Sequence, residues 1–140
     1  MPQQNSKKFK ILPHTADVRL LIFGSSFEEI FKNALLGMAQ ILKPTEMKNK
    51  TISQKIKIKS LDPPALLIDF LSEILYLSTT NKAIYKELKI EVVTPTSIEA
   101  EIKGVKVKSF GEDIKGVTYH ESYFQQKSEN VWEALVIFDI

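Results

Sequence analysis

Acidic groups near the two ends of the chain are the residues in this sequence best suited to chemistry. Asp17 ends the polar stretch His14-Thr15-Ala16-Asp17, and Asp139 is followed by the carboxylate of the last residue, Ile140. The last five residues are otherwise apolar, whereas a chain end is commonly polar and frayed, so we expect this end to be docked into the fold. If it docks beside Asp17, three negative charges share one small volume.

A cluster of three anions needs compensation, which makes these groups candidate metal ligands. At about 4 Å and an effective dielectric constant near 20, each like-charged pair costs roughly 4 kcal/mol. Protonation, a nearby lysine or a bound cation would offset that cost. Oxygen ligands without histidine or cysteine favour Ca²⁺, Mg²⁺ or Mn²⁺ over zinc. The simpler interpretation is that Asp17 caps a turn or pairs with a lysine.

Lys115 and the two histidines are the other candidates. Lys115 precedes Gly116 at the predicted start of a strand, where its ammonium group can project past the sheet edge. On its own, it is more simply explained as one more solvated lysine. His14 and His120 could lie around a metal, but a lone histidine is more often a hydrogen-bonded structural residue.

Two predicted helices must help to position these groups. Residues 27–42 carry apolar side chains at helical spacing, and Ser26 with Glu29 matches a capping box. Asp62 followed by a proline is typical of a second helix start, and its apolar stripe runs to about Leu77. The residues after each stripe, Pro44 and the segment 79–81, are typical helix ends.

The remaining periodic segments predict strands because they alternate in hydrophobicity or are rich in β-branched residues. They are residues 18–23, 52–59, 87–93, 97–103, 105–110, 116–123 and 131–139. The order of strand, helix, strand, helix and then a run of strands predicts an α+β fold. We expect a single domain at 9–140, with a mixed or mostly antiparallel sheet and two helices packed on one of its faces, after a frayed N-terminus at 1–8.

Composition excludes several classes of protein. The 140 residues contain no cysteine, which removes disulfide scaffolds, thiolate zinc sites and cysteine nucleophiles. The sequence has no glycine-rich phosphate loop and no Gly-x-Ser-x-Gly motif. Apolar runs are too short to span a membrane and the N-terminus does not match a secretory signal, so we expect a cytoplasmic protein without membrane contact.

Charge is unevenly distributed along the chain. Residues 1–60 carry eleven basic and four acidic side chains, whereas residues 61–140 carry eight and thirteen. A basic surface made by the first half would suit nucleic acid. Because sequence halves need not become surfaces, a mixed, solvated surface is the alternative.

Four short stretches of the sequence resemble the archease family, in the family's order and over residues 14–140. They are His14-Thr15-Ala16-Asp17, Leu71-Ser72-Glu73-Ile74-Leu75-Tyr76-Leu77, Ile114-Lys115-Gly116-Val117-Thr118-Tyr119-His120 and Phe138-Asp139-Ile140. The resemblance implies an accessory protein, not an enzyme, that serves the RNA-splicing ligase in tRNA splicing. It would promote guanylylation of the ligase and allow multiple turnover, and would meet RNA only through the ligase.

The same resemblance implies roles for individual residues. A divalent cation, Ca²⁺ first and Mg²⁺ or Mn²⁺ as alternatives, would be bound by Asp17, Asp139 and the carboxylate of Ile140. Lys115 would take part in ligase activation, and His14 and His120 would lie around the metal without binding it. The sequence departs from the family at Arg19, where many members have a small residue, and before Gly111, where a usual histidine is missing.

Two other functions remain open from the residues themselves. One is a general chaperone or RNA-binding adaptor that acts through the basic N-terminal half, using the lysines between Lys43 and Lys59. The other is a small hydrolase with Asp17, Asp139 and His120 around a metal, although no nucleophile motif accompanies those acids.

Overall fold

The computed structural model describes residues 7–140, which form seven strands and two helices. The elements in chain order are β1 (Phe9–Pro13), β2 (Asp17–Gly24), α1 (Phe27–Leu42), β3 (Pro44–Lys59), α2 (Pro63–Asn81), β4 (Ala83–Thr94), β5 (Ser97–Phe110), β6 (Gly116–Ser128) and β7 (Val131–Asp139).

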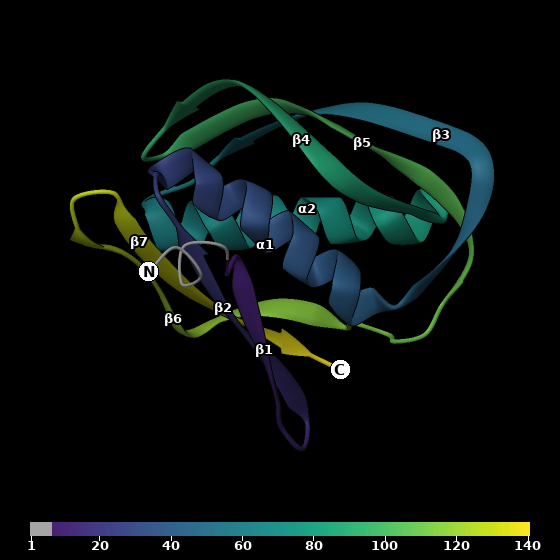
Figure 1. The fold of residues 1–140 in the computed structure, drawn as a ribbon, viewed down its shortest axis with the longest axis horizontal. Coiled ribbons are helices and arrows are strands. Elements are labelled where there is room, and N and C mark those ends of the chain that lie inside the picture. Colours follow the sequence, from purple (N-terminus) through teal and green to yellow (C-terminus); the bar gives the residue numbers. More distant parts are fainter. Residues whose placement is uncertain (1–6) are drawn as a thin grey trace.

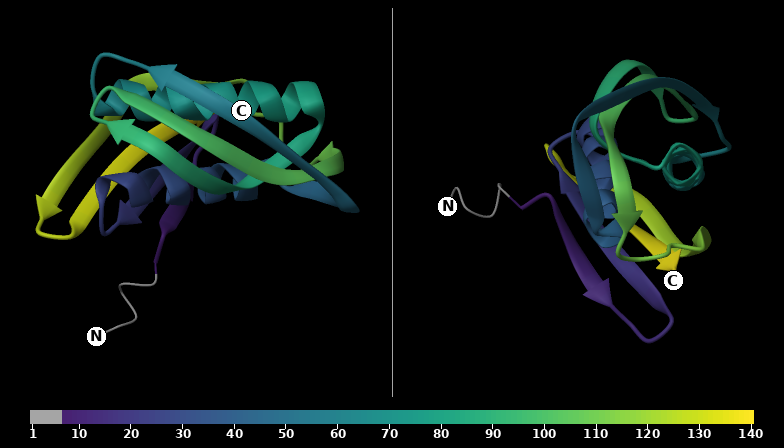
Figure 2. Two further views of the ribbon diagram at one scale, coloured as in Figure 1. Left: turned by 90° about the horizontal axis from the view of Figure 1, so that it is seen from above. Right: turned by 90° about the vertical axis from the view of Figure 1, so that its right-hand side faces the viewer.

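The strands form two antiparallel sheets with both helices between them (Figures 1 and 2). One sheet has the order β1-β2-β7-β6 and the other has the order β3-β5-β4. Helix α1 packs on β2 of the first sheet and β4 of the second, and α2 packs on β6 and β4. The apolar core therefore has three layers, with the helices covered on two sides.

The predicted α+β class, the antiparallel strands and the packing of both helices on one face of a sheet are confirmed. The strands divide between two sheets, however, where the sequence suggested one. The sequence analysis also missed β1, a five-residue strand that pairs with β2 along its whole length. The expected frayed segment 1–8 lies mostly outside the described residues.

The two helices begin where their capping residues predict. Ser26 Oγ accepts the Glu29 N–H at 3.1 Å, and Glu29 reaches back to the N–H of Ser25 at 2.6 Å. Asp62 Oδ1 accepts the Ala65 N–H at 2.9 Å. Helix α1 ends as predicted, but α2 continues four residues beyond Leu77, to Asn81. Each helix is closed by a lysine in the left-handed conformation, which lets the chain turn directly into a strand.

Strand β5 runs without a break through Gly104, where the sequence analysis placed a boundary between two strands. A Cβ atom at Gly104 would lie 1.8 Å from the carbonyl oxygen of Ile84 on β4. The register of β4 against β5 shifts at this point, between Tyr85 and Glu87. The glycine is therefore a close-approach position beside a bulge and does not end the strand.

No helix within residues 7–140 is long and apolar enough to cross a membrane.

We expect Gly104→Ala to lower the free energy of unfolding by about 2 kcal/mol or more, because the added methyl group meets backbone that cannot move aside as a side chain can. Gly116→Ala is the matched control in a strand, since a Cβ there meets no atom within 4 Å. Urea unfolding of both variants measures the difference. Equal stabilities would contradict the close approach of β4 and β5.

Candidate functional site

The antiparallel register of β2 and β7 places the two aspartates predicted as ligands opposite each other. Asp17 pairs with Asp139, and Asp139 pairs on its other side with Gly116 of β6. Side chains of directly paired residues lie on the same face of a sheet. The two carboxylates therefore share one face, next to a position without a side chain.

Hydrophobic alternation decides which face this is. The buried side chains that join the core are Val18, Leu20 and Ile22 in β2, and Ala134, Val136 and Phe138 in β7. These residues face the helices, so the alternate residues, including both aspartates, face away from the core. A shift of one residue in the register of either strand would turn one carboxylate toward the helices.

The last residue is held at the same place. The N–H of Ile140 lies 3.5 Å from the carbonyl oxygen of Ala16, and the Ile140 side chain packs against the core. The N–H of Lys115 donates to the carbonyl oxygen of Asp139 at 2.7 Å. The end of β7 is thus fixed on both sides, which supports the expectation that the terminal segment is docked.

Three observations fit a cation bound at this acidic pair. Asp17 Oδ1 is buried and has no hydrogen-bond partner among the described residues. A buried carboxylate oxygen without a donor is costly, and a cation would satisfy it. Two like charges stand directly opposite each other, and the space that a side chain at position 116 would take is open.

The acidic pair supplies only two side-chain carboxylates. Within residues 7–140, no group of three or more histidine, cysteine, aspartate or glutamate side chains could hold a metal ion. A third protein ligand would therefore have to be a group of another kind, and the carboxylate of Ile140 is the one the sequence suggests. The role of Asp17, Asp139 and Ile140 as ligands stays a prediction.

The other predicted residues lie at different distances from this pair. His14 Nδ1 is 3.9 Å from Asp17 Oδ1, beyond hydrogen-bond distance. The Lys115 main chain adjoins Asp139, but its ammonium group lies 4.0 Å from Asp113 and its side chain is 67% exposed. His120 contacts Glu121, with 3.1 Å between Nε2 and Oε2. The structure thus brings His14 next to the pair and places His120 in a separate cluster.

A wide bulge in β6 carries that cluster. Thr118 pairs with Ile137 and Tyr123 pairs with Leu135, so residues 119–122 lie opposite a single residue of β7. Glu121 has φ of 58°, the left-handed conformation that side-chain-bearing residues seldom adopt. The sequence analysis placed one regular strand here, because the stretch shows no glycine or proline that would mark a bulge.

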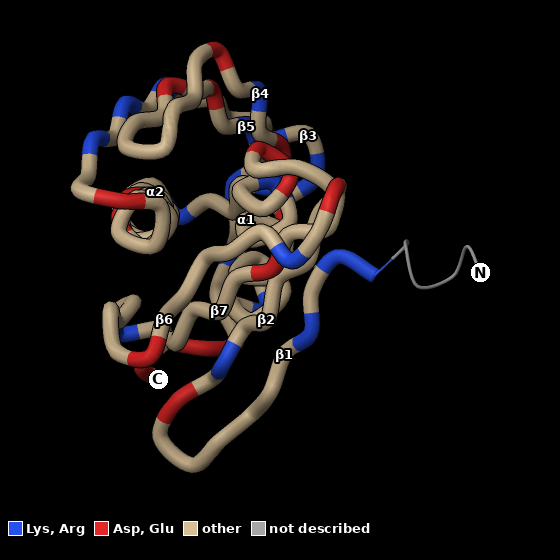
Figure 3. Tube along the Cα trace, turned by 90° about the vertical axis from the view of Figure 1, so that its left-hand side faces the viewer, with Lys and Arg blue, Asp and Glu red and all other residues tan. Residues whose placement is uncertain are grey.

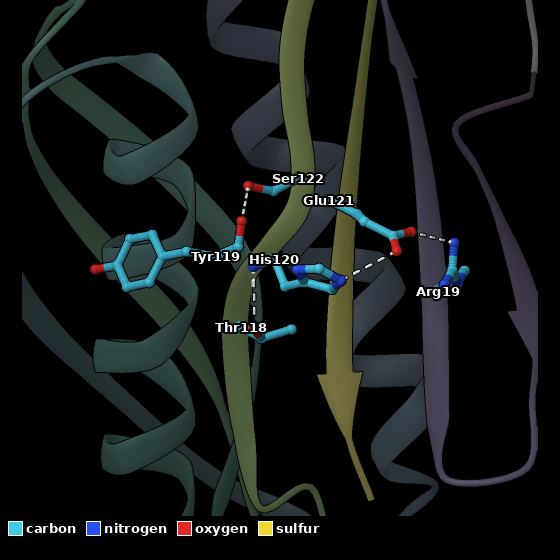
Figure 4. Close-up of polar contacts among 6 residues, drawn as sticks. All are labelled: Arg19, Thr118, Tyr119, His120, Glu121 and Ser122. Carbon is cyan, nitrogen blue, oxygen red and sulfur yellow. Dashed lines mark hydrogen bonds and ion pairs between the residues drawn. The ribbon is translucent and has the colours of Figure 1, made fainter.

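Contacts on two sides hold the bulge in place, and Figure 4 shows the one with β2. Tyr119 donates a hydrogen bond to Asp69 of α2, which also accepts one from Ser60. Glu121 reaches across β7 to Arg19 of β2, with 2.9 Å between Oε1 and Nη1. The bulge therefore contacts α2 on the helix side of the sheet and β2 on the outer face. Sequence reasoning did not find this pair, whose members are 102 residues apart.

Two tyrosines of β6 hydrogen-bond to carboxylates, which shifts their acidity. The hydrogen bond to Asp69, with some burial, raises the pKa of Tyr119. Burial, followed by a 2.5 Å hydrogen bond to Glu133, raises the pKa of Tyr123 to about 12. Both shifts favour the neutral phenol, which donates to the carboxylate.

The lysines of β3, which were candidates for a basic surface, belong to a sheet whose strands carry both basic and acidic residues (Figure 3). Lys55 lies 3.8 Å from Glu91 of β4, and Lys57 lies 3.9 Å from Glu99 of β5. The three strands of this sheet carry ten lysines and five glutamates, so the sheet is mixed in charge but keeps an excess of positive charge.

The fold and site define a small α+β protein that carries an acidic pair at the junction of its first long strand and its last strand. The sequence profile described as the Archease protein family (MTH1598/TM1083) matches residues 9–140. The chain is 32% identical to the protein archease of Methanosarcina mazei, covering all of both chains. It is 33% identical to that of Methanosarcina barkeri, covering 96% of this chain and 97% of the other. The chain belongs to the archease family.

Solved structures agree with this fold. The solution structure of protein 1598 from Methanobacterium thermoautotrophicum matches with a TM-score of 0.70 at 22% identity, over 94% of this chain and 98% of the other. The crystal structure of an archease from Thermotoga maritima, described as a possible chaperone, matches with a TM-score of 0.60 at 23% identity, over 94% of this chain and 96% of the other. The family profile and the archease relatives thus agree on the family, and the solved structures agree on the fold.

We expect the hydrogen bond of Tyr123 to make the stability of the protein fall at alkaline pH. Its pKa is higher in the folded chain, about 12, than the ordinary value of 10.0, so its contribution is full below pH 10.0 and is lost as the pH rises through about 12. Urea unfolding from about pH 9 to about pH 12 should show a smaller loss for Tyr123→Phe than for the wild type.

Tyr76→Phe is the control for this measurement, because the Tyr76 side chain is exposed on α2. This control should follow the wild-type pH dependence, since it leaves the hydrogen bond to Glu133 in place. Identical pH dependence in Tyr123→Phe and the wild type would show that Tyr123 does not couple to folding.

Proposed function

We propose that this protein activates an RNA-splicing ligase, promoting guanylylation of the ligase and its multiple turnover, through a divalent cation bound at the acidic pair. The pairing of Asp17 with Asp139 across β2 and β7 is the observation that carries the proposal. Membership of the archease family supports it, because the resemblance of the sequence motifs implies this activity.

The residues of the chain have distinct parts in this proposal. Asp17 and Asp139 supply carboxylate oxygens from paired strands, and the carboxylate of Ile140 supplies a third ligand from the next residue. This set of hard oxygen donors suits Ca²⁺, with Mg²⁺ or Mn²⁺ as alternatives. When bound, the cation supplies positive charge that can compensate phosphate oxygens.

Lys115 adds a mobile positive charge next to this site. Its main chain is fixed to Asp139, while its ammonium group is exposed and only loosely paired with Asp113. Guanylylation forms a bond between a histidine nitrogen of the ligase and the α-phosphorus of GTP, and releases pyrophosphate. A lysine that can reach the phosphates would stabilise the charge on the leaving pyrophosphate. We assign the chemistry itself to the ligase, so this protein acts as an accessory factor.

The acidic pair can be tested with isosteric variants. In a mixture of ligase, GTP and Mn²⁺, Asp17→Asn and Asp139→Asn should each lower the rate of ligase guanylylation by about tenfold or more, because each removes a charged ligand. Glu129→Gln is the matched control, since it removes an exposed carboxylate in the turn between β6 and β7, outside the acidic pair and away from Lys115 in the chain. Equal rates for all four proteins would reject the role of the pair.

The contribution of Ile140 can be tested by extending the chain. Residues added after Ile140 convert its carboxylate into an amide and remove one negative charge from the site. We expect weaker cation binding, measured by calorimetry, and less ligase activation than in a protein that carries the same residues at its N-terminus. Matching affinities of the two tagged proteins would show that the carboxylate is not a ligand.

A further inference from the structure

Arg19 lies close enough to the acidic pair to oppose a cation there. It is the next residue after Asp17 on the same face of β2, because side chains alternate along a strand. Two strand residues span about 7 Å. A free guanidinium group at this distance would repel a divalent ion and would also compete with it for the carboxylates.

Glu121 forms an ion pair with this guanidinium group. Its Oε1 is 2.9 Å from Arg19 Nη1, and this is the ion pair that Arg19 makes within residues 7–140. The ion pair lies two residues along the strands from the aspartates, at the next position on the same face. There Arg19 of β2 pairs with Ile137 of β7, which pairs in turn with Thr118 of β6. Figure 4 shows the Glu121 side chain spanning β7 to meet the guanidinium group.

The local structure fixes Glu121 in this position. The residue adopts a left-handed backbone conformation within the four-residue bulge, and such a conformation persists when its surroundings hold it. Tyr119 ties one end of the bulge to α2 through Asp69, and Ser122 Oγ donates to the Tyr119 carbonyl oxygen at 2.9 Å. Ile137, beneath the crossing side chain, is only 3% exposed although it faces away from the helices.

We propose that Glu121 is a positioning residue for the cation site: it holds the Arg19 guanidinium away from Asp17 and Asp139 and cancels its charge. This inference rests on the proposed function, since it assumes that the acidic pair binds a divalent cation. The site would then depend on a residue that does not touch the metal and that lies on a different strand from both aspartates.

Cation affinity, measured by calorimetry with Ca²⁺ at low ionic strength, tests the inference without the ligase. Glu121→Gln keeps the size of the side chain but frees Arg19, so it should weaken Ca²⁺ binding about fivefold, the effect of one unit charge about 8 Å from a divalent ion in water. The double variant with Arg19→Gln and Glu121→Gln should regain wild-type affinity, which a merely unfolded or distorted site could not do.

Glu129→Gln is the matched control, because Glu129 is an exposed glutamate in the turn between β6 and β7 and its loss changes the net charge by the same amount. It should leave Ca²⁺ affinity unchanged. The deficit of Glu121→Gln should also shrink at about 1 M salt, where the Debye length is about 3 Å.

The possible results separate the two proposals. Wild-type Ca²⁺ binding with no change in Glu121→Gln, or a deficit that Arg19→Gln fails to repair, would overturn the role of Glu121 and leave the proposed function intact. Absence of Ca²⁺ binding to the wild-type protein would overturn both. A deficit repaired by the second substitution supports the inference.

Discussion

The pairing of β2 with β7 is the constraint on which the rest of the structure depends. These two strands form the centre of the four-stranded sheet, with β1 and β6 at its edges. Their buried residues alternate in step, so Leu20 and Val136 are paired and both face the helices. The same register sets Asp17 against Asp139 on the opposite face. Burial of one face thus determines the geometry of the polar face.

This register is energetically unfavourable where the start of β2 meets the end of β7. Like charges directly opposite each other destabilise a sheet, and one oxygen of Asp17 has no hydrogen-bond partner within residues 7–140. Natural folds keep such features when a site needs them. The neighbouring charge differs, because Arg19 forms an ion pair with Glu121. Glu121 lies in the bulge that is hydrogen-bonded to α2. Within residues 7–140, the acidic pair has only His14 nearby, at 3.9 Å from Asp17, whereas Arg19 is paired with Glu121 at 2.9 Å.

Much of the fold follows from local sequence signals, because those signals describe interactions between near neighbours. The caps at Ser26 and Asp62 fix where the helices begin, and the alternation in β7 identifies that strand to the residue. Signals fail where the deciding interaction is distant. In the sequence, Gly104 is typical of a strand end, and only the close backbone of β4 explains why a glycine stands there. The division into two sheets likewise depends on which strands pair, and local periodicity does not encode this.

The sequence predicted which two aspartates lie together, but it did not predict the side-chain contacts around them. Asp17 and Asp139 stand out as isolated acids next to apolar strands, and an apolar chain end indicates docking. The bulge around Glu121 has no such signal, because residues 118–123 contain no glycine or proline that would mark it. Its consequence, the ion pair with Arg19, joins residues that only the completed sheet brings together.

The central place of β7 also affects how the protein is made. A ribosome releases β1 and β2 long before β7 exists, and β6 has no neighbour in this sheet other than β7. One edge of β2 therefore stays unpaired until β7 has been made and has inserted between β2 and β6. Nascent chains that stop before β7 lack Asp139, so they cannot form the acidic pair.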